Sequence, residues 1–383
     1  MKLALLTTDS REHFKTYERP LPYFGAAPEA LIDGFRSLPD LEVHIVSCVR
    51  QKMTSPEKLA PNIWFHNLLV SKSGWMRTLY RGCVRAVRSK LRQIRPDIVH
   101  GQGSERDCAL TAVCSGFPAV VTIHGNMAEL ARLFHASAFS FQWLAARLED
   151  FALKRSTGVF CNSAYTEQLV APRTPRTWRV PNALRMEFFS PPTPGERASK
   201  CTLLNVGVIT ERKRQLELLD LAEQLYRKGC RFELLFLGEA YSWDPYGAQF
   251  LERIKPMEAA GYARYLGMRP VKELVELFDH SHALIHIPSE EAFGLVVAEA
   301  LARDLKFFGS RVGGIIDISQ DAPGVELFGL EDWAGLSSAL ATWIESGARR
   351  PSGAAEVMRA RYHPEIIARR HLEIYREVLR SDS

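Results

Sequence analysis

The sequence predicts an α/β protein with two parallel sheets, each flanked by helices. Short apolar runs of strand length alternate with segments of helical period along the chain, and this alternation is typical of βαβ units. The alternation occurs twice, on either side of a proline-rich stretch at residues 190–196. A length of 383 residues, at about 150 residues per domain, agrees with two domains that each bury a core.

The expected elements can be placed in order along both halves. Apolar runs predict strands in the first half at Lys2–Thr7, Glu42–Ser47, Ile98–His100, Ala119–Ile123 and Gly158–Asn162, with helices such as Pro28–Leu38 and Phe141–Lys154 between them. The second half predicts strands at Thr202–Val206, Phe232–Leu237, Arg264–Leu266, Ala283–Ile287 and Lys306–Phe308. We expect domains at residues 1–190 and 191–360, and a closing amphipathic helix within 361–383 that packs back on the first domain.

Composition excludes several classes of protein. With 46% hydrophobic and 24% charged residues the chain is an ordinary globular one, and no apolar stretch approaches the ~20 residues of a membrane-spanning helix. The start of the chain turns polar after Leu6, which does not fit a secretory signal, so we expect a cytoplasmic protein. Seven scattered cysteines without zinc-type spacing predict reduced thiols and no metal site.

Positive charge is concentrated in the first half. Residues 1–190 hold 25 Lys and Arg against 16 Asp and Glu, whereas residues 191–383 hold 24 against 28. From Lys72 to Pro96 there are eight basic residues and no acidic one, and apolar residues recur at helical spacing after Trp75. This pattern predicts a basic amphipathic helix. Its apolar stripe could pack on the sheet while the arginines face water, or the helix could face an anionic membrane or acceptor.

Residues 288–302 form the most informative segment, which predicts a strand, a loop and a helix. A helix that opens at Phe293, Gly294 and Leu295 offers free backbone N–H groups to an anionic phosphate, and Gly294 has no Cβ to hold a ligand away. Glu299 lies among apolar residues of this helix and needs partners if it is buried, which ribose hydroxyls would supply. The alternative is that Glu299 is a solvent-facing helix residue and Glu291 an ordinary loop residue.

Glu291 and Glu299, in the setting S-E-E-A-F-G-L-V-V-A-E-A-L-A, resemble the E-x7-E signature of the retaining GT-B glycosyltransferases of family GT4. The resemblance implies two Rossmann-like doubly wound domains that face each other across a cleft. It also implies that Glu291 binds hydroxyls of the donor sugar and that Glu299 binds the ribose. The backbone of residues 293–295 would then contact the sugar and the phosphates.

Other positions resemble the same family in the same order. The run Asn205–Lys213 resembles the strand and loop that carry the diphosphate-binding lysine, which implies that role for Lys213. A valine, Val208, stands where an arginine is usual, and Arg212 or Arg214 could substitute for it. Without the resemblance, residues 211–214 would read equally well as the solvated start of a helix.

Three further positions carry the resemblance. His124 follows the strand Ala119–Ile123, at the end of the sheet where ligands bind, and resembles the active-site histidine of the family. Gly25 lies where the family has a Gly-Gly loop, although Ala26 replaces the second glycine. Met268, after Gly267, resembles the loop that meets the base through its main chain.

We therefore expect a retaining, metal-independent glycosyltransferase with His124, Lys213 and Glu291 as its catalytic residues. It would transfer a hexose-type sugar from a UDP- or GDP-sugar to a hydroxyl of a glycan, a lipid or a small molecule. No cofactor and no nucleic-acid partner are expected, and the basic helix could hold the protein at the inner face of a membrane.

Two alternatives belong to other classes of function. Val208 and Ala26 favour a sugar-nucleotide-binding protein of the same fold that has lost transfer, and a donor hydrolysis assay would separate the two. The run Gly101–Arg106 is similar to a dinucleotide fingerprint, but Arg106 stands in place of the third glycine and the run lies outside the first βαβ unit. An NAD(P)-dependent oxidoreductase is therefore not favoured.

Overall fold

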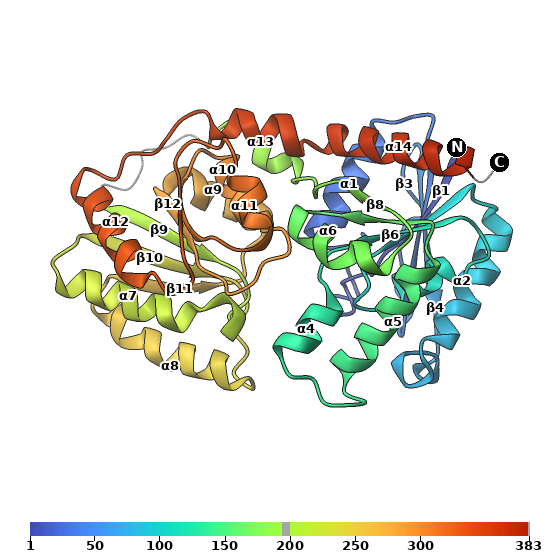
Figure 1. Cartoon of the computed structure of the whole chain (residues 1–383), viewed down its shortest axis with the longest axis horizontal. Helices are drawn as coiled ribbons and strands as arrows, with labels where there is room; N and C mark the ends of the chain where they lie inside the picture. The colour runs from blue at the N-terminus through green and yellow to red at the C-terminus, as the bar shows by residue number, and fades with distance from the viewer. Residues whose placement is uncertain (194–199, 382–383) are drawn as a thin grey trace. The chain divides into compact units, whose positions relative to one another are not determined.

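The computed structural model describes residues 1–193 and 200–381, which divide into two compact units (Figure 1). Unit 1 comprises Met1–Arg185 and Tyr362–Ser383, and unit 2 comprises Met186–Arg361. The division falls ahead of the proline-rich stretch at which the sequence placed it. Residues Pro194, Gly195 and Glu196 of that stretch lie outside the described residues.

The sheet of unit 1 has eight strands in the order β3-β4-β2-β1-β5-β6-β7-β8. Neighbouring strands are parallel, except that β3 and β4 are antiparallel. The five expected strands form the middle, namely β1 (Lys2–Leu6), β2 (Glu42–Val49), β5 (Ile98–Gln102), β6 (Ala119–Ile123) and β7 (Gly158–Cys161). The strands that the sequence did not predict lie toward the edges, namely β3 (Lys58–Ala60), β4 (Ile63–Leu69) and β8 (Thr177–Arg179).

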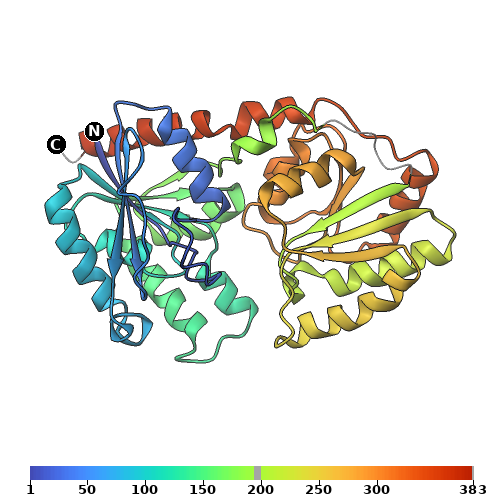
Figure 2. The ribbon, with the colours of Figure 1, turned by 180° about the vertical axis from the view of Figure 1, so that it is seen from behind.

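Both faces of this sheet are buried because side chains alternate along each strand. On β1, Leu3 and Leu5 belong to one apolar core, and Ala4 and Leu6 belong to another. The helices around the sheet are α1 (Ala26–Arg36), α2 (Arg81–Ile94), α3 (Cys108–Val113), α4 (Met127–Leu133), α5 (Phe141–Arg155), α6 (Ala164–Val170) and α14 (Pro364–Ser381). In Figures 1 and 2, α14 runs beside α1. The closing helix thus packs on unit 1, where the His371 ring stacks on that of Phe160 at 4.6 Å.

The predicted basic helix is shorter than the sequence suggested. The segment that begins at Lys72 forms two 3-10 turns, at Lys72–Gly74 and Met76–Thr78, and α2 itself begins at Arg81. Leu79 and Tyr80 break the helix with left-handed backbone angles (φ 52° and 57°), a conformation that α-helices do not contain. The apolar side of α2 packs into unit 1 through Cys83, Val87, Leu91 and Ile94.

The sheet of unit 2 has six parallel strands in the order β11-β10-β9-β12-β13-β14. The strands are β9 (Cys201–Val206), β10 (Phe232–Leu237), β11 (Ala263–Gly267), β12 (Ala283–His286), β13 (Lys306–Ser310) and β14 (Val325–Phe328), and only β14 was not predicted. The helices are α7 (Gln215–Arg227), α8 (Pro245–Ala259), α9 (Val271–His280), α10 (Leu295–Leu301), α11 (Gly313–Ser319), α12 (Trp333–Glu345) and α13 (Ala354–Tyr362). Figures 1 and 2 show α7 and α8 on the face of this sheet opposite α9, α10 and α11.

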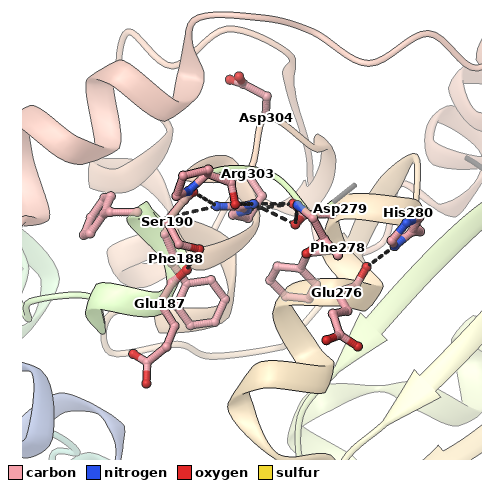
Figure 3. A network of polar contacts seen from close by, with 12 residues as sticks. Glu187, Phe188, Ser190, Glu276, Phe278, Asp279, His280, Arg303 and Asp304 are labelled. Carbon is pink, nitrogen blue, oxygen red and sulfur yellow. Dashed lines mark hydrogen bonds and ion pairs between the residues drawn. The ribbon is translucent and has the colours of Figure 1, made fainter. Parts of the chain in front are cut away.

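A buried ion pair anchors the first residues of unit 2 (Figure 3). Arg303 and Asp279 form two hydrogen bonds of 2.7 Å, and their side chains are only 4% and 5% exposed. Arg303 also donates to the carbonyl of Ser190 (2.6 Å), and Asp279 accepts from the backbone N–H of Thr193 (2.8 Å). This network fixes the chain as it enters the unit.

Across the described residues, we find no helix with the length and apolar character that a membrane crossing requires.

Candidate active site

The carboxyl ends of β9 and β12 in unit 2 bring a lysine, a histidine and a glutamate together. Lys213 lies in a 3-10 turn after β9, His286 ends β12, and Glu291 follows in the next loop. Lys213 Nζ forms an ion pair with Glu291 Oε2, and His286 Nε2 lies 3.3 Å from both of these atoms. Because β9 and β12 are adjacent and parallel, the cluster lies at the edge where open α/β sheets bind ligands.

Burial and neighbouring charges set the protonation of this cluster. His286 is 1% exposed, and its burial, reinforced by the charge of Lys213, lowers the pKa of the ring to about 4. Burial alone would raise the pKa of Glu291, but Lys213 and His286 hold that pKa well below its ordinary value. At neutral pH the cluster therefore contains an uncharged imidazole beside the ion pair of Lys213 and Glu291.

The two arginines beside this lysine have different partners. Arg212 Nη1 donates to the backbone carbonyl (2.6 Å) and to the carboxylate (3.2 Å) of Glu290. Arg214 instead stacks over the ring of Trp333, 4.8 Å from its centre, at the start of α12. Arg212 is thus placed beside the Glu291 loop, whereas the guanidinium of Arg214 is already engaged elsewhere. Val208, where the sequence lacks the usual arginine, is 42% exposed.

The loop after β12 leads from Glu291 into α10. Phe293 is 3% exposed, so its side chain packs inward. Gly294 has a left-handed backbone conformation (φ 99°), and Leu295 begins the helix. Since the Phe293 side chain faces the core, a ligand could meet this residue only through its main chain, which agrees with the role that the resemblance implies.

Two glycines that the sequence analysis missed support this loop. The N–H of Gly314 donates to the carbonyl of Glu291 (2.9 Å), and a Cβ at Gly313 would lie 1.9 Å from the same oxygen. Only a glycine at position 313 allows α11 to approach the loop this closely. The available signal was a Gly-Gly pair shortly after the strand that ends at Ser310.

Glu299 lies on the buried side of α10 and is 5% exposed. The solvent-facing alternative for this residue is therefore wrong. A carboxylate in this position must be hydrogen-bonded or paired, because burial of an isolated charge is costly.

Met268 follows β11 at the same edge of the sheet and is 59% exposed. The carbonyl of Gly267 accepts from the N–H of Gly238 (3.1 Å), so this loop is tied to the end of β10. The hydroxyl of Tyr265 also donates to the carbonyl of Gly238 (2.9 Å). The main chain of the loop at Gly267 and Met268 is thus held at the end of the unit 2 sheet that carries Lys213.

In unit 1, His124 directly follows β6. Its Nε2 lies 3.0 Å from Oε1 of Gln102, the last residue of β5, so Nε2 carries the proton and Nδ1 the lone pair. Nδ1 is buried and has no hydrogen-bond partner of normal geometry among the described residues. Burial lowers the pKa of His124 to about 4, and the nearby Asn182 side chain offsets this only in part. His124 is therefore a neutral imidazole at pH 7.

Gly25 precedes α1, which begins at Ala26. Its φ of 84° is a conformation that favours glycine, yet a Cβ there would have no neighbour within 4 Å. Ala27, in the first turn of α1, lines the same small cavity as His124. The Gly25 loop and the candidate histidine therefore lie in one region of unit 1.

The structure thus distributes the predicted site residues over the two units. The residues in unit 1 are Gly25 and His124. The residues in unit 2 are Arg212, Lys213, Met268, Glu291, Phe293, Gly294, Leu295 and Glu299.

One buried group brings together three side chains that could supply metal ligands. One ligand atom from each of Cys48, Cys83 and Asp107 lies within 4.8 Å of the other two. The residues are distant in sequence, so spacing within a motif could not reveal them. Structural zinc sites use four protein ligands, and this group supplies three.

Two family models match the chain. The model described as Glycosyltransferase Family 4 matches residues 31–187, and the one described as Glycosyl transferases group 1 matches residues 189–356. A curated relative, N-acetyl-alpha-D-glucosaminyl L-malate synthase of Bacillus anthracis, is 28% identical over 153 residues, which is 39% of each chain.

Solved structures support the same fold. Sucrose-phosphate synthase from Thermosynechococcus elongatus superimposes with a TM-score of 0.77 at 16% identity over 100% of both chains. HepE from Anabaena, solved with UDP and glucose, has a TM-score of 0.72 at 15% identity over 98% of this chain and 100% of its own. The lipopolysaccharide outer core galactosyltransferase WaaB has a TM-score of 0.68 at 15% identity over 100% of both chains.

These structural matches establish a GT-B fold with two Rossmann-like domains. Since the two family models together account for nearly the whole length, the chain belongs to the GT4 family of glycosyltransferases, also described as group 1.

Proposed function

We propose that the protein transfers a hexose-type sugar from a nucleotide-diphosphate sugar, a UDP- or GDP-sugar, to an acceptor hydroxyl with retention of configuration. The observation that carries the proposal is the cluster of Lys213, His286 and Glu291 at the carboxyl end of the unit 2 sheet. The cluster places Lys213, a cation that can pair with a diphosphate, next to Glu291, a carboxylate that can accept hydrogen bonds from a sugar.

The chemistry divides between these groups. The bond from the anomeric carbon to the diphosphate breaks, the acceptor oxygen forms the new glycosidic bond, and the acceptor proton leaves on the nucleoside diphosphate or passes to water. Lys213 would stabilise the negative charge that develops on the leaving diphosphate, with Arg212 as a second cation nearby. Glu291, ionised because its pKa is low, would accept hydrogen bonds from sugar hydroxyls.

The remaining site residues would position the donor. Glu299 would bind the ribose, the main chain of residues 293–295 the sugar and phosphates, and the main chain at Met268 the base. His124 would meet the sugar near the reacting carbon, and the Gly25 loop would face the diphosphate. HepE is described with UDP and glucose bound, which supports a nucleotide-diphosphate sugar as the donor.

We also propose that neither a metal nor a cofactor takes part. The side chains of Lys213 and Arg212 would supply the positive charge that a divalent cation supplies to diphosphates in other enzymes. Excess EDTA should therefore leave transfer intact, and activity that EDTA abolishes and Mg²⁺ restores would contradict this part of the proposal.

The first test is a thermal-shift screen of the protein against UDP, GDP, ADP and their sugar conjugates. We expect one nucleotide and its sugar conjugate to raise the melting temperature. Incubation with that conjugate should then release the free nucleoside diphosphate, and NMR of the product should show the anomeric configuration of the donor. Binding without any release would favour the alternative of a binding protein that has lost transfer.

A basic face of unit 1 supports a second proposal, reversible attraction to an anionic membrane surface at the cytoplasmic side. Arg81, Arg85, Arg88 and Arg92 are exposed on α2, while the apolar residues of that helix pack into unit 1. Attraction would therefore act through charge alone, without insertion of the helix into the bilayer.

A further inference from the structure

A polar pocket in unit 1 has no role in the donor site just described. It has a volume of about 250 Å³ and lies where β1 and β5 end. Its polar lining comes from Thr8, Ser10, His13, Gln102, Glu105 and Arg106. Water occupies roughly 30 Å³ per molecule, so the space suits a small polar molecule or the end of a larger one.

The pocket adjoins the candidate histidine. Gln102 lines the pocket, and its Oε1 accepts the hydrogen bond from His124 Nε2 (3.0 Å). A molecule in the pocket would thus lie one side chain away from the residue proposed to meet the donor sugar. This position fits an acceptor rather than a second donor.

The loop that carries Ser10 is held in place by a buried ion pair. Arg11 and Asp9 are both fully buried and form hydrogen bonds as short as 2.6 Å. Arg11 also donates to the carbonyls of Arg19 (2.7 Å) and Thr54 (3.1 Å). The pocket is therefore formed in the free protein.

Two guanidinium groups stand at this end of unit 1. The central guanidinium carbons (Cζ) of Arg50 and Arg106 lie 4.6 and 5.3 Å from the ring centre of Trp75. Within residues 1–193 and 200–381, no carboxylate lies within ion-pair distance of either side chain. Asp107 is close enough for both arginines to act on its pKa, but burial raises that pKa more than they lower it. Arg106 lines the pocket and can therefore pair with an incoming acid, whereas Arg50 is not among the lining residues.

Glu105 supplies the opposite chemistry in the same pocket. Its Oε1 accepts the backbone N–H of Gly125 (2.9 Å), the residue after His124. Burial raises the pKa of Glu105. Its carboxyl group is held beside His124, where it can accept a hydrogen bond from a hydroxyl.

We infer that this pocket binds the acceptor, and that the acceptor is a hydroxyl-bearing molecule that also carries a carboxylate or a phosphate. Glu105 accepts a hydrogen bond from the hydroxyl that receives the sugar, and Arg106 pairs with the acid group. This inference rests on the proposed function and narrows its acceptor from any hydroxyl compound to an acidic one. The acid group belongs either to a free small molecule or to a lipid headgroup.

A matched series of glycerol compounds tests the inference by calorimetric titration of the whole protein. Glycerol has hydroxyls and no charge, glycerate adds a carboxylate, and glycerol 3-phosphate adds a phosphate. We expect at least one acid to bind at a single site about tenfold or more tightly than glycerol, the scale of one charge-assisted hydrogen bond. Arg106→Gln should remove that difference and Arg106→Lys should restore part of it. The exposed Arg92, changed to Gln, should leave it intact.

Phosphatidylglycerol vesicles test the lipid source. At about 0.5 M salt the general attraction of a basic surface is screened. Vesicle binding that persists at this salt and is lost in Arg106→Gln supports a lipid headgroup. Glycerate or glycerol 3-phosphate binding that depends on Arg106 supports a free acid.

The inference is overturned if glycerol binds as tightly as the acids and vesicle binding does not depend on Arg106. It is overturned equally if no probe binds. UDP and GDP titrations separate this result from the donor proposal, since Arg106→Gln should leave nucleotide affinity unchanged. A wild type that binds the acids but no nucleotide would contradict the proposed donor alone.

Discussion

The candidate sites in the two units are built in different ways. In unit 2, Lys213, His286 and Glu291 touch one another, and Glu290 to Leu295 form one continuous segment from the loop after β12 into the start of α10. In unit 1, His124 follows β6, whereas Gln102 ends β5 and Glu105 lies in the loop after it, and single hydrogen bonds link the two strand ends. A charged donor needs a compact cluster of counter-charges, whereas an acceptor pocket can be assembled from loops that vary independently.

Removal of Lys213 should give the largest effect. Lys213→Ala should slow transfer about 10²-fold or more, because one group that stabilises developing charge is lost. The change would also leave the Glu291 carboxylate without its cation. The exposed Lys272, changed to Ala, is the matched control in the same unit and should leave turnover unchanged. A rate within a fewfold of wild type would remove Lys213 from the mechanism.

The two glutamates should separate binding from turnover. Glu299→Gln should weaken nucleotide affinity about tenfold, the scale of hydrogen bonds to a charged group, because its proposed partner is the ribose. Glu291→Gln should lower kcat more than the affinity for UDP or GDP, because its proposed partner is the sugar. Calorimetry with the free nucleotide and steady-state kinetics provide the two measurements. If Glu291→Gln lost nucleotide affinity instead, the two roles would be reversed.

Alanine substitutions at two glycines, one in each unit, test how tightly the two sites are packed. Gly313→Ala would place a Cβ 1.9 Å from the carbonyl oxygen of Glu291, so the donor loop must move. We expect it to cost about 1–3 kcal/mol of stability, the scale of overpacking, and to weaken donor binding. Gly25→Ala meets no atom within 4 Å and strains only its own backbone (φ 84°, ψ 162°), in a region that only glycine adopts readily, which costs about 1–3 kcal/mol.

Thermal unfolding and donor titration of both variants provide the comparison. Gly25→Ala should lower the melting temperature and weaken donor binding less than Gly313→Ala does, because no neighbouring atom has to move. Equal loss of donor affinity in both variants would mean that α11 does not position the loop.

We expect a fall in pH to lower the stability of unit 1 more than that of unit 2. Burial lowers the pKa of His124 and His371 in unit 1 to about 4, and it lowers that of His100 well below its ordinary value of 6.5. Unit 2 has His286, also near 4. Between pH 6.5 and 4 the unfolded histidines bind protons that the folded ones do not, so stability falls as pH falls through this window.

Protection of backbone amides in unit 1, corrected for intrinsic exchange rates, should therefore fall more between pH 7 and pH 5 than protection in unit 2. Hydrogen-exchange mass spectrometry of the whole chain would resolve the two. Replacement of His371 by Gln should reduce the difference. Equal loss of protection in both units would show that these histidines do not govern acid sensitivity.

The fold could be predicted further than the sites could. Central strands such as Leu3–Leu6 are apolar on both sides because both faces are buried, and this makes them visible as continuous runs. Strands toward the edges were not predicted because β8 has only three residues and β4 is partly exposed, so neither forms a continuous apolar run. The break before α2 was not predicted either, because neither leucine nor tyrosine favours the left-handed backbone angles that Leu79 and Tyr80 adopt.

Site residues could be predicted from the sequence only where they lie close to one another along the chain. Glu291 and Glu299 lie in one short segment, so their spacing is readable. His286 lay inside the predicted strand Ala283–Ile287, where nothing marked it as a site residue, and its contact with Lys213 spans 73 positions. Glu105 and Arg106 lie in a dinucleotide-type run, and nothing in the sequence links them to Thr8 and Ser10. Their relation to Thr8 and Ser10 depends on the adjacency of β1 and β5 in the sheet.

The smallest effect concerns the basic face of unit 1. Each Lys or Arg near an anionic surface contributes about 1 kcal/mol at low salt. The exposed arginines of α2 should therefore sediment the protein with anionic liposomes at low salt, and neutral liposomes should leave it in solution. Because Val87 and Leu91 are buried in unit 1, no apolar surface of α2 is available to hold the protein once charge is screened. About 0.5 M salt, where the Debye length is only a few Å, should release it completely.

The variant with Arg81, Arg85, Arg88 and Arg92 all changed to Gln should lose sedimentation and retain nucleotide affinity, since the donor residues belong to unit 2. A control with Arg227, Arg253, Arg264 and Arg269 of unit 2 changed to Gln removes the same number of charges from another surface. If that control lost sedimentation equally, net charge rather than the α2 face would govern attraction. Sedimentation with neutral liposomes, or retention at high salt that does not depend on Arg106, would require an apolar contact that α2 does not offer, and would locate the membrane-binding surface elsewhere.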